Sequence, residues 1–116
     1  MTIFNNAYLS LGSNIGDSKQ HLINAVEQIK MGIGEVNKCS SLYSTKPLPT
    51  PSDIEQGDFF NIVIEITTAL KPLKLLYSLL EIEKRLGRVR EEDLRWGPRI
   101  IDIDIILYQN LSLIHI

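Results

Sequence analysis

The sequence predicts an α+β fold, a ferredoxin-like β-α-β-β-α-β sandwich in which helices pack on one antiparallel sheet. Two observations predict it. Segments with alternating apolar and polar residues, typical of strands, flank two segments whose apolar residues recur at helical spacing. The length of 116 residues is enough for one small domain with a core of its own, and not for two.

The first two elements are a strand and a helix. Residues 7–14, AYLSLGSN, alternate and then break at Gly12-Ser13-Asn14, which predicts a strand that runs into a turn. Asp17 or Ser18 can cap the helix that follows. Its apolar residues at i, i+4 and i+7 are Leu22, Val26 and Ile29.

A second strand and a long loop come next. The Gly-Ile-Gly sequence at 32–34 ends the helix, and residues 35–45 predict the second strand. Residues 46–58 carry three prolines and no periodicity, which indicates an exposed loop. A loop of this length in a compact domain is typical of a binding element.

The second half of the chain repeats the pattern. Residues 59–68, FFNIVIEITT, predict a strand with Phe60, Ile62, Ile64 and Ile66 on one face. Pro72 suits the first turn of a helix that Gly87 ends. Residues 88–99 indicate a second loop, and residues 100–108 predict the last strand. The apolar stripe of the helix is Leu75, Leu79, Ile82 and Leu86.

Composition narrows the class of protein. The formal net charge of −2 gives no overall attraction to nucleic acid or to a membrane surface. The single cysteine, Cys39, cannot form an internal disulfide, which favours a reducing compartment. The chain shows neither a signal peptide nor an apolar stretch of about 20 residues. We therefore expect a cytoplasmic protein, monomeric, without nucleic-acid or membrane partners.

Two aspartates mark the last strand. In the sequence RWGPRIIDIDII, Asp102 and Asp104 lie on one face because side chains alternate along a strand. Ile101, Ile103 and Ile105 then face the core. Two neighbouring carboxylates repel unless a cation lies between them, and Mg²⁺ favours one or two carboxylates together with substrate phosphates. The alternative is an exposed strand face with two solvated acids.

The loop before this strand is rich in arginine. Arg88, Arg90, Arg95 and Arg99 occur within twelve residues, together with Trp96. Guanidinium groups bind phosphate oxygens in a bidentate manner, so the loop and the aspartates suit phosphoryl transfer. The alternative is a solvated loop whose own acidic residues balance its charge.

These residues also carry a family resemblance. The pattern Arg95-x-Gly97-Pro98-Arg99-x-x-Asp102-x-Asp104-Ile105-Ile106 resembles the signature of the 6-hydroxymethyl-7,8-dihydropterin pyrophosphokinases. The segments LSLGSNIGD, SLYSTKPL, GDFFNIVIEITT and EIEKRLGRVR resemble other parts of that family, in order, as far as about residue 110.

The resemblance implies a reaction and its machinery. An enzyme of this family transfers the terminal pyrophosphoryl group of ATP to the hydroxymethyl oxygen of the pterin in folate biosynthesis, and releases AMP. Asp102 and Asp104 would then hold two Mg²⁺ ions. Arg88 and Arg99 would be catalytic and clamp the triphosphate. The remaining ATP-binding residues implied are Glu83, Arg90, Arg95, Trp96 and Ile105.

The resemblance also implies a pterin site. Asn61 would read the pterin edge through hydrogen bonds, with Phe59 as its aromatic neighbour. Thr45, through its backbone, and Leu48 would form the wall. The alternatives are a packed aromatic side chain for Phe59 and a polar residue near a turn for Asn61.

The end of the chain departs from the family. Family members continue with a Pro-His segment, an arginine and a second aromatic residue. Residues 111–116, LSLIHI, equal the translation of a transposon end used as a sequencing adapter. We therefore expect a pyrophosphokinase domain at 1–110, about three-quarters of such a domain, an adapter-derived tail at 111–116, and weak or absent turnover. A natural hydrophobic tail is the alternative.

Two other functions stay open at this point. The first is a ferredoxin-like module that binds phosphate or nucleic acid without catalysis, which the acidity of the chain and its paired aspartates disfavour. The second is a purely structural or interaction domain. Loss of ATP–Mg²⁺ binding in an Asp102→Ala variant would exclude it.

Overall fold

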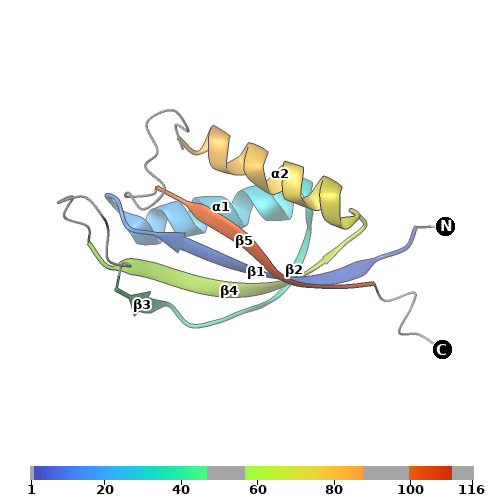
Figure 1. The fold of residues 1–116 in the computed structure, drawn as a ribbon, viewed down its shortest axis with the longest axis horizontal. Coiled ribbons are helices and arrows are strands. Elements are labelled where there is room, and N and C mark those ends of the chain that lie inside the picture. The colour runs from blue at the N-terminus through green and yellow to red at the C-terminus, as the bar shows by residue number, and fades with distance from the viewer. Residues whose placement is uncertain (1, 47–56, 88–99, 111–116) are drawn as a thin grey trace.

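The computed structural model describes residues 2–46, 57–87 and 100–110 and contains two helices and five strands in this part of the chain (Figure 1). The strands form one sheet with the order β2-β4-β1-β5, and β3 also pairs with β4. Every strand pair is antiparallel, which confirms the predicted fold class. The elements are β1 (Asn5–Ser13), α1 (Ser18–Gly32), β2 (Gly34–Cys39), β3 (Tyr43–Thr45), β4 (Phe59–Thr68), α2 (Pro72–Arg85) and β5 (Asp102–Gln109).

Both helices cover the same face of the sheet, and the core lies between them and the strands (Figure 1). The predicted apolar faces are confirmed, because alternate residues of the two central strands are buried. We call the other side of the sheet, away from the helices, the open face. The buried apolar residues of the strands are Ala7, Leu9, Leu11, Ile62, Ile64, Ile66 and Ile103.

The two helices begin and end where the sequence predicts. Asp17 is the N-cap of α1, and its carboxylate accepts a hydrogen bond of 3.2 Å from the backbone N–H of Gln20. Pro72 occupies the first turn of α2. At the other end of α2, Gly87 has a φ of 109°, a left-handed conformation that glycine adopts without strain. The buried apolar residues of the helices are Leu22, Ala25, Ile29, Leu75, Leu79 and Ile82.

The prediction of one continuous strand at 35–45 is wrong, because the structure divides this segment into β2 and β3. Ser40 lies at the break. Its side-chain oxygen accepts the N–H of Val63 at 2.9 Å, and its own N–H donates to the Val63 carbonyl at 2.8 Å. A serine side chain that bonds the neighbouring strand competes with regular backbone pairing, and here it replaces one backbone acceptor.

The last strand begins two residues later than predicted and contains a bulge. Leu9 pairs with Ile105 and Tyr8 pairs with Leu107, so Ile106 is the extra residue in β5. Before the bulge, the alternation of the isoleucines and the aspartates is as predicted. Beyond it, Tyr108 turns to the helix side, where its hydroxyl donates to the Leu70 carbonyl at 2.8 Å.

Candidate functional site

Predicted site residues from three different strands share the open face of the sheet. Phe59 and Asn61 on β4, Thr45 on β3 and Asp102 on β5 all lie on this side. The register explains their proximity, because Gly12 of β1 pairs with Asn61 on one side and with Asp102 on the other. We call this set of paired residues, Tyr43, Asn61, Gly12 and Asp102, the Gly12 row.

Gly12 is the centre of this row and contributes no side chain to it. A Cβ at this position would lie 2.8 Å from Asn61 Oδ1 and 3.5 Å from the Phe59 ring. The lack of a side chain at Gly12 therefore leaves room on the open face for the Asn61 amide oxygen. Neither spacing nor composition pointed to Gly12 as a site residue, and only the strand register reveals its place.

The amide of Asn61 is held in one orientation by its neighbours. Its nitrogen donates to the Thr45 hydroxyl oxygen at 2.9 Å and to the Phe59 carbonyl oxygen at 3.3 Å. A carbonyl oxygen only accepts, so the nitrogen is the atom that faces it. Asn61 Oδ1 then points toward Gly12, and no described residue donates a hydrogen bond to it.

The two aspartates lie on the open face of β5, as predicted. Asp102 is partly buried and pairs with Gly12, and Asp104 is exposed and pairs with Ser10. Two carboxylates two residues apart on a strand supply hard oxygen ligands of the kind that Mg²⁺ prefers, and phosphate and water oxygens can complete its octahedron. Within the described ranges, no group of three or more His, Cys, Asp or Glu side chains gathers. The two carboxylates of Asp102 and Asp104 are a donor set that suits a hard cation such as Mg²⁺.

Glu83 fastens helix α2 to the strand that carries the aspartates. Its side chain is 2% exposed, and its carboxylate accepts the backbone N–H of Ile103 at 2.8 Å. This N–H lies between Asp102 and Asp104, so Glu83 fixes the backbone that positions both. In the sequence, only the family resemblance indicated Glu83. Glu83 follows Ile82 of the apolar stripe of α2, and the spacing of that stripe did not predict that a carboxylate next to it would be buried.

Ile105 lies on the helix side, partly buried against the core, as the alternation predicts. Its suggested place in an ATP site stays a prediction. Six of the predicted site residues lie outside the described residues, and the structure gives no account of them. They are Leu48, Arg88, Arg90, Arg95, Trp96 and Arg99.

A second polar group occupies the other end of the open face. We call Asn6, Tyr8, Asn37, Lys38, Glu65 and Thr67 the Glu65 cluster. The Tyr8 hydroxyl donates to Glu65 Oε2 at 2.6 Å, and the Asn37 amide donates to Glu65 Oε1 at 3.3 Å and to Thr67 Oγ1 at 2.7 Å. The Thr67 hydroxyl donates in turn to Asn6 Oδ1 at 3.2 Å.

These contacts shift two pKa values in opposite directions. The hydrogen bond from Tyr8 is the main cause of a lowered pKa of Glu65, and Asn37 and Lys38 lower it further against the opposing effect of desolvation. The same hydrogen bond is the main cause of a raised pKa of Tyr8. The cluster therefore favours an ionised glutamate and a neutral tyrosine.

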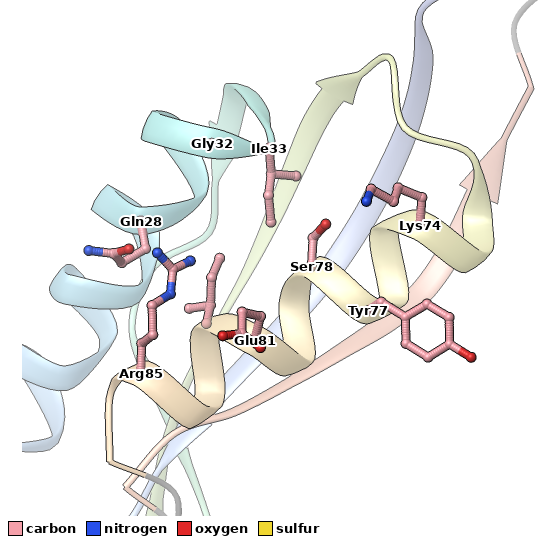
Figure 2. Close-up of a pocket in the computed structure, with 9 residues that line it drawn as sticks. Gln28, Gly32, Ile33, Lys74, Tyr77, Ser78, Glu81 and Arg85 are labelled. Atoms are coloured by element: carbon pink, nitrogen blue, oxygen red, sulfur yellow. The ribbon is translucent and has the colours of Figure 1, made fainter.

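Two of the pockets that described residues line lie on the helix side, away from the predicted site. One lies between α1 and α2 and is lined by residues such as Gln28, Lys74, Glu81 and Arg85 (Figure 2). The other lies between α1 and the segment 39–42 and is mainly apolar. None of the predicted site residues in the described part of the chain lines either pocket. Neither α1 nor α2 has the length and hydrophobicity that a membrane-crossing helix needs.

Comparisons with known proteins identify the family of this chain. Residues 8–116 match the family model described as 7,8-dihydro-6-hydroxymethylpterin-pyrophosphokinase. The 2-amino-4-hydroxy-6-hydroxymethyldihydropteridine pyrophosphokinase of Bacillus subtilis is 44% identical over 105 residues, which are 90% of this chain and 60% of that protein. The protein of the same name from Aquifex aeolicus is 40% identical over 103 residues, 89% of this chain and 61% of that protein.

A solved structure supports the fold. The HPPK-DHPS structure from Plasmodium falciparum superposes with a TM-score of 0.71 over 91% of this chain and 29% of that chain. At 17% sequence identity, this likeness establishes the fold alone. The present chain spans about three fifths of the length of the two bacterial relatives.

Proposed function

Because this chain belongs to the 7,8-dihydro-6-hydroxymethylpterin-pyrophosphokinase family, we propose that it binds ATP and 6-hydroxymethyl-7,8-dihydropterin at the Gly12 row and transfers pyrophosphate between them. The hydroxymethyl oxygen attacks the β-phosphorus of ATP, the bond between that phosphorus and the α–β bridging oxygen breaks, and AMP leaves. The products are AMP and the pterin diphosphate, a step of folate biosynthesis.

One observation carries the proposal. Asn61 and Asp102 flank Gly12 in the antiparallel registers of β1 with β4 and β5, so a group that suits a heterocycle and a group that suits metal-bound phosphate lie on the two sides of one glycine. Transfer between two bound substrates requires such adjacency, because positioning supplies much of the rate acceleration in phosphoryl transfer.

The aspartates belong to the phosphate side of the site. Asp102 and Asp104 would hold two Mg²⁺ ions, which when bound neutralise charge on the ATP phosphates. Glu83 supports them through its hydrogen bond to the intervening Ile103 N–H. In this way a buried side chain of α2 keeps both carboxylates on the open face.

In this proposal, the arginine-rich residues 88–99 supply positive charge in addition to that of the metal ions. Arg88 and Arg99 would clamp the triphosphate near the attacked phosphorus, since guanidinium groups match phosphate oxygens. Arg90, Arg95 and Trp96 would bind ATP from the same segment, and Glu83 and Ile105 would border it. These roles rest on the family resemblance of EIEKRLGRVR at 81–90 and of the signature at 95–106.

The other side of Gly12 would receive the pterin. Asn61 presents its carbonyl oxygen there and can accept a hydrogen bond from a ring N–H or amino group. The Phe59 ring beside it suits the flat face of a heterocycle, and Thr45 and Leu48 would form the wall. We also infer a cytoplasmic location, since the lone Cys39 suits a reducing compartment. A monomer remains our expectation for the oligomeric state.

The test is formation of AMP from labelled ATP in the presence of Mg²⁺. We expect AMP and pterin diphosphate to appear in equal amounts, and only when the hydroxymethyl-dihydropterin is present. Omission of the pterin is the control for plain ATP hydrolysis. Release of ADP, or a rate of ATP breakdown that the pterin does not change, would contradict the proposal.

A further inference from the structure

The Thr45 hydroxyl lies in a position to control the Asn61 amide. Thr45 is diagonal to Asn61 across the β3–β4 pair, on the same open face, and its oxygen accepts the Asn61 N–H at 2.9 Å. The amide nitrogen also donates to the Phe59 carbonyl at 3.3 Å. It therefore has two acceptors within the protein, as many as it has hydrogens.

This arrangement fixes what Asn61 offers to a ligand. With its nitrogen occupied, the side chain presents Oδ1, an acceptor, toward the place where Gly12 lacks a side chain. The Thr45 hydroxyl, which accepts from the amide, keeps its own hydrogen as a donor. An acceptor next to a donor complements the N–H and C=O edge of a cyclic amide.

We propose that the side-chain hydroxyl of Thr45 is a positioning residue that holds the Asn61 amide with its oxygen toward Gly12 and so sets the preference of this site for a ring edge with an N–H donor. The inference rests on the proposed function, in which that ring is the pterin. It assigns to the hydroxyl of Thr45 a part that the family resemblance gave only to its backbone.

The same open face contains a matched control. Thr67 accepts a hydrogen bond of 2.7 Å from the Asn37 amide nitrogen, a threonine–asparagine contact like that of Thr45 and Asn61. Thr67 belongs to the Glu65 cluster and lies six residues from Asn61 along β4. Thr45→Val removes the contact with Asn61, and Thr67→Val removes the contacts with Asn37 and Asn6. Both variants keep a β-branched side chain in the strand.

The experiment measures the affinity for 6-hydroxymethyl-7,8-dihydropterin in a double-mutant cycle. Loss of one orienting hydrogen bond predicts about five- to tenfold weaker binding for Thr45→Val, near wild-type binding for Thr45→Ser, and unchanged binding for Thr67→Val. If Thr45 acts through Asn61, Thr45→Val has less than about a twofold effect in an Asn61→Ala background. Wild-type affinity in Thr45→Val, or an equal loss in both backgrounds, would overturn the proposal.

A second readout does not need the pterin. In the ligand-free protein, the Asn61 side-chain NH₂ signals in an NMR spectrum should move, and their hydrogens should exchange faster, in Thr45→Val but not in Thr45→Ser or Thr67→Val. If the wild-type protein does not bind the pterin, the proposed function fails, and these signals alone decide the role of Thr45. Unchanged NH₂ signals in Thr45→Val would overturn it.

Discussion

The two ends of the open face use polar residues in different ways. In the Glu65 cluster, donors and acceptors satisfy one another, since Tyr8 and Asn37 each donate to one carboxylate oxygen of Glu65. In the Gly12 row, a glycine separates Asn61 from Asp102, and Asn61 directs an oxygen into the space. The difference teaches that polar residues on a sheet do not by themselves mark a site. We propose that the arrangement around Gly12, which lacks a side chain, distinguishes the binding end of the open face.

Removal of one carboxylate at each end tests this comparison most severely. We expect Asp102→Asn to reduce AMP formation about 100-fold or more, because metal-assisted charge stabilisation contributes several kcal/mol to the transition state. Glu65→Gln should keep the rate within about threefold of wild type, because its carboxylate only serves the cluster. Equal losses of AMP formation in both variants would abolish the distinction.

Two glycines sharpen the comparison between ligand binding and folding. A Cβ at Gly34 would meet the Thr67 backbone carbonyl, which cannot move aside, so Gly34→Ala should lower the free energy of unfolding by about 1–3 kcal/mol. A Cβ at Gly12 would meet the end of the Asn61 side chain, which can move if it weakens its hydrogen bonds to Thr45 and Phe59. Gly12→Ala should therefore lower the free energy of unfolding by about 1 kcal/mol, less than Gly34→Ala.

The Gly12→Ala variant should nevertheless bind the pterin about tenfold more weakly, since the new methyl group displaces the amide oxygen of Asn61. Chemical denaturation of both variants measures the free energy of unfolding, and pterin titration measures their affinity for the pterin. A Gly12→Ala protein that binds the pterin as wild type does would remove Gly12 from the account of the site.

The smallest expected effect is a pH dependence at the Glu65 cluster. The pKa of Glu65 is lowered on folding, so its stabilisation is present above the pKa of the unfolded chain and is lost as pH falls through the folded value. The pKa of Tyr8 is raised, so its contribution is lost as pH rises through that higher value. The stability difference between wild type and Tyr8→Phe should then be largest from about pH 5 to 9 and shrink on both sides.

Urea denaturation across this pH range measures that difference. Tyr43→Phe is the matched control, because Tyr43 lies on the same face and its hydroxyl bonds no described residue. A difference between wild type and Tyr8→Phe that stays constant down to about pH 3 would show that Glu65 does not mediate it.

Most of the fold follows from the sequence. Alternation from Phe59 to Thr68 predicted both bounds of β4, and Asp17, Pro72 and Gly87 predicted helix ends. The break at Ser40 did not follow, because it depends on a side chain that bonds another strand. The bulge at Ile106 did not follow either, because it depends on the pairing of β5 with β1. The residues around Ile106 fit a regular strand equally well.

The site was predictable in part for a similar reason. Asp102 and Asp104 were identified from strand periodicity, which is local in sequence. The link between Glu83 and the Ile103 N–H joins residues 20 positions apart, and the place of Gly12 depends on two strand registers. Such contacts are set by tertiary structure, and no local pattern encodes them.

The central claim is that the ligands bind at the Gly12 row and not elsewhere on the open face. Each end carries an asparagine whose side-chain amide donates to a threonine hydroxyl, Asn61 in the row and Asn37 in the cluster. Titration with Mg²⁺, a non-hydrolysable ATP analogue and the pterin should shift the NMR signals of the Asn61 side chain and the Gly12 backbone N–H and leave those of Asn37 in place. Shifts at Asn37 with none at Asn61 and Gly12 would contradict the claim.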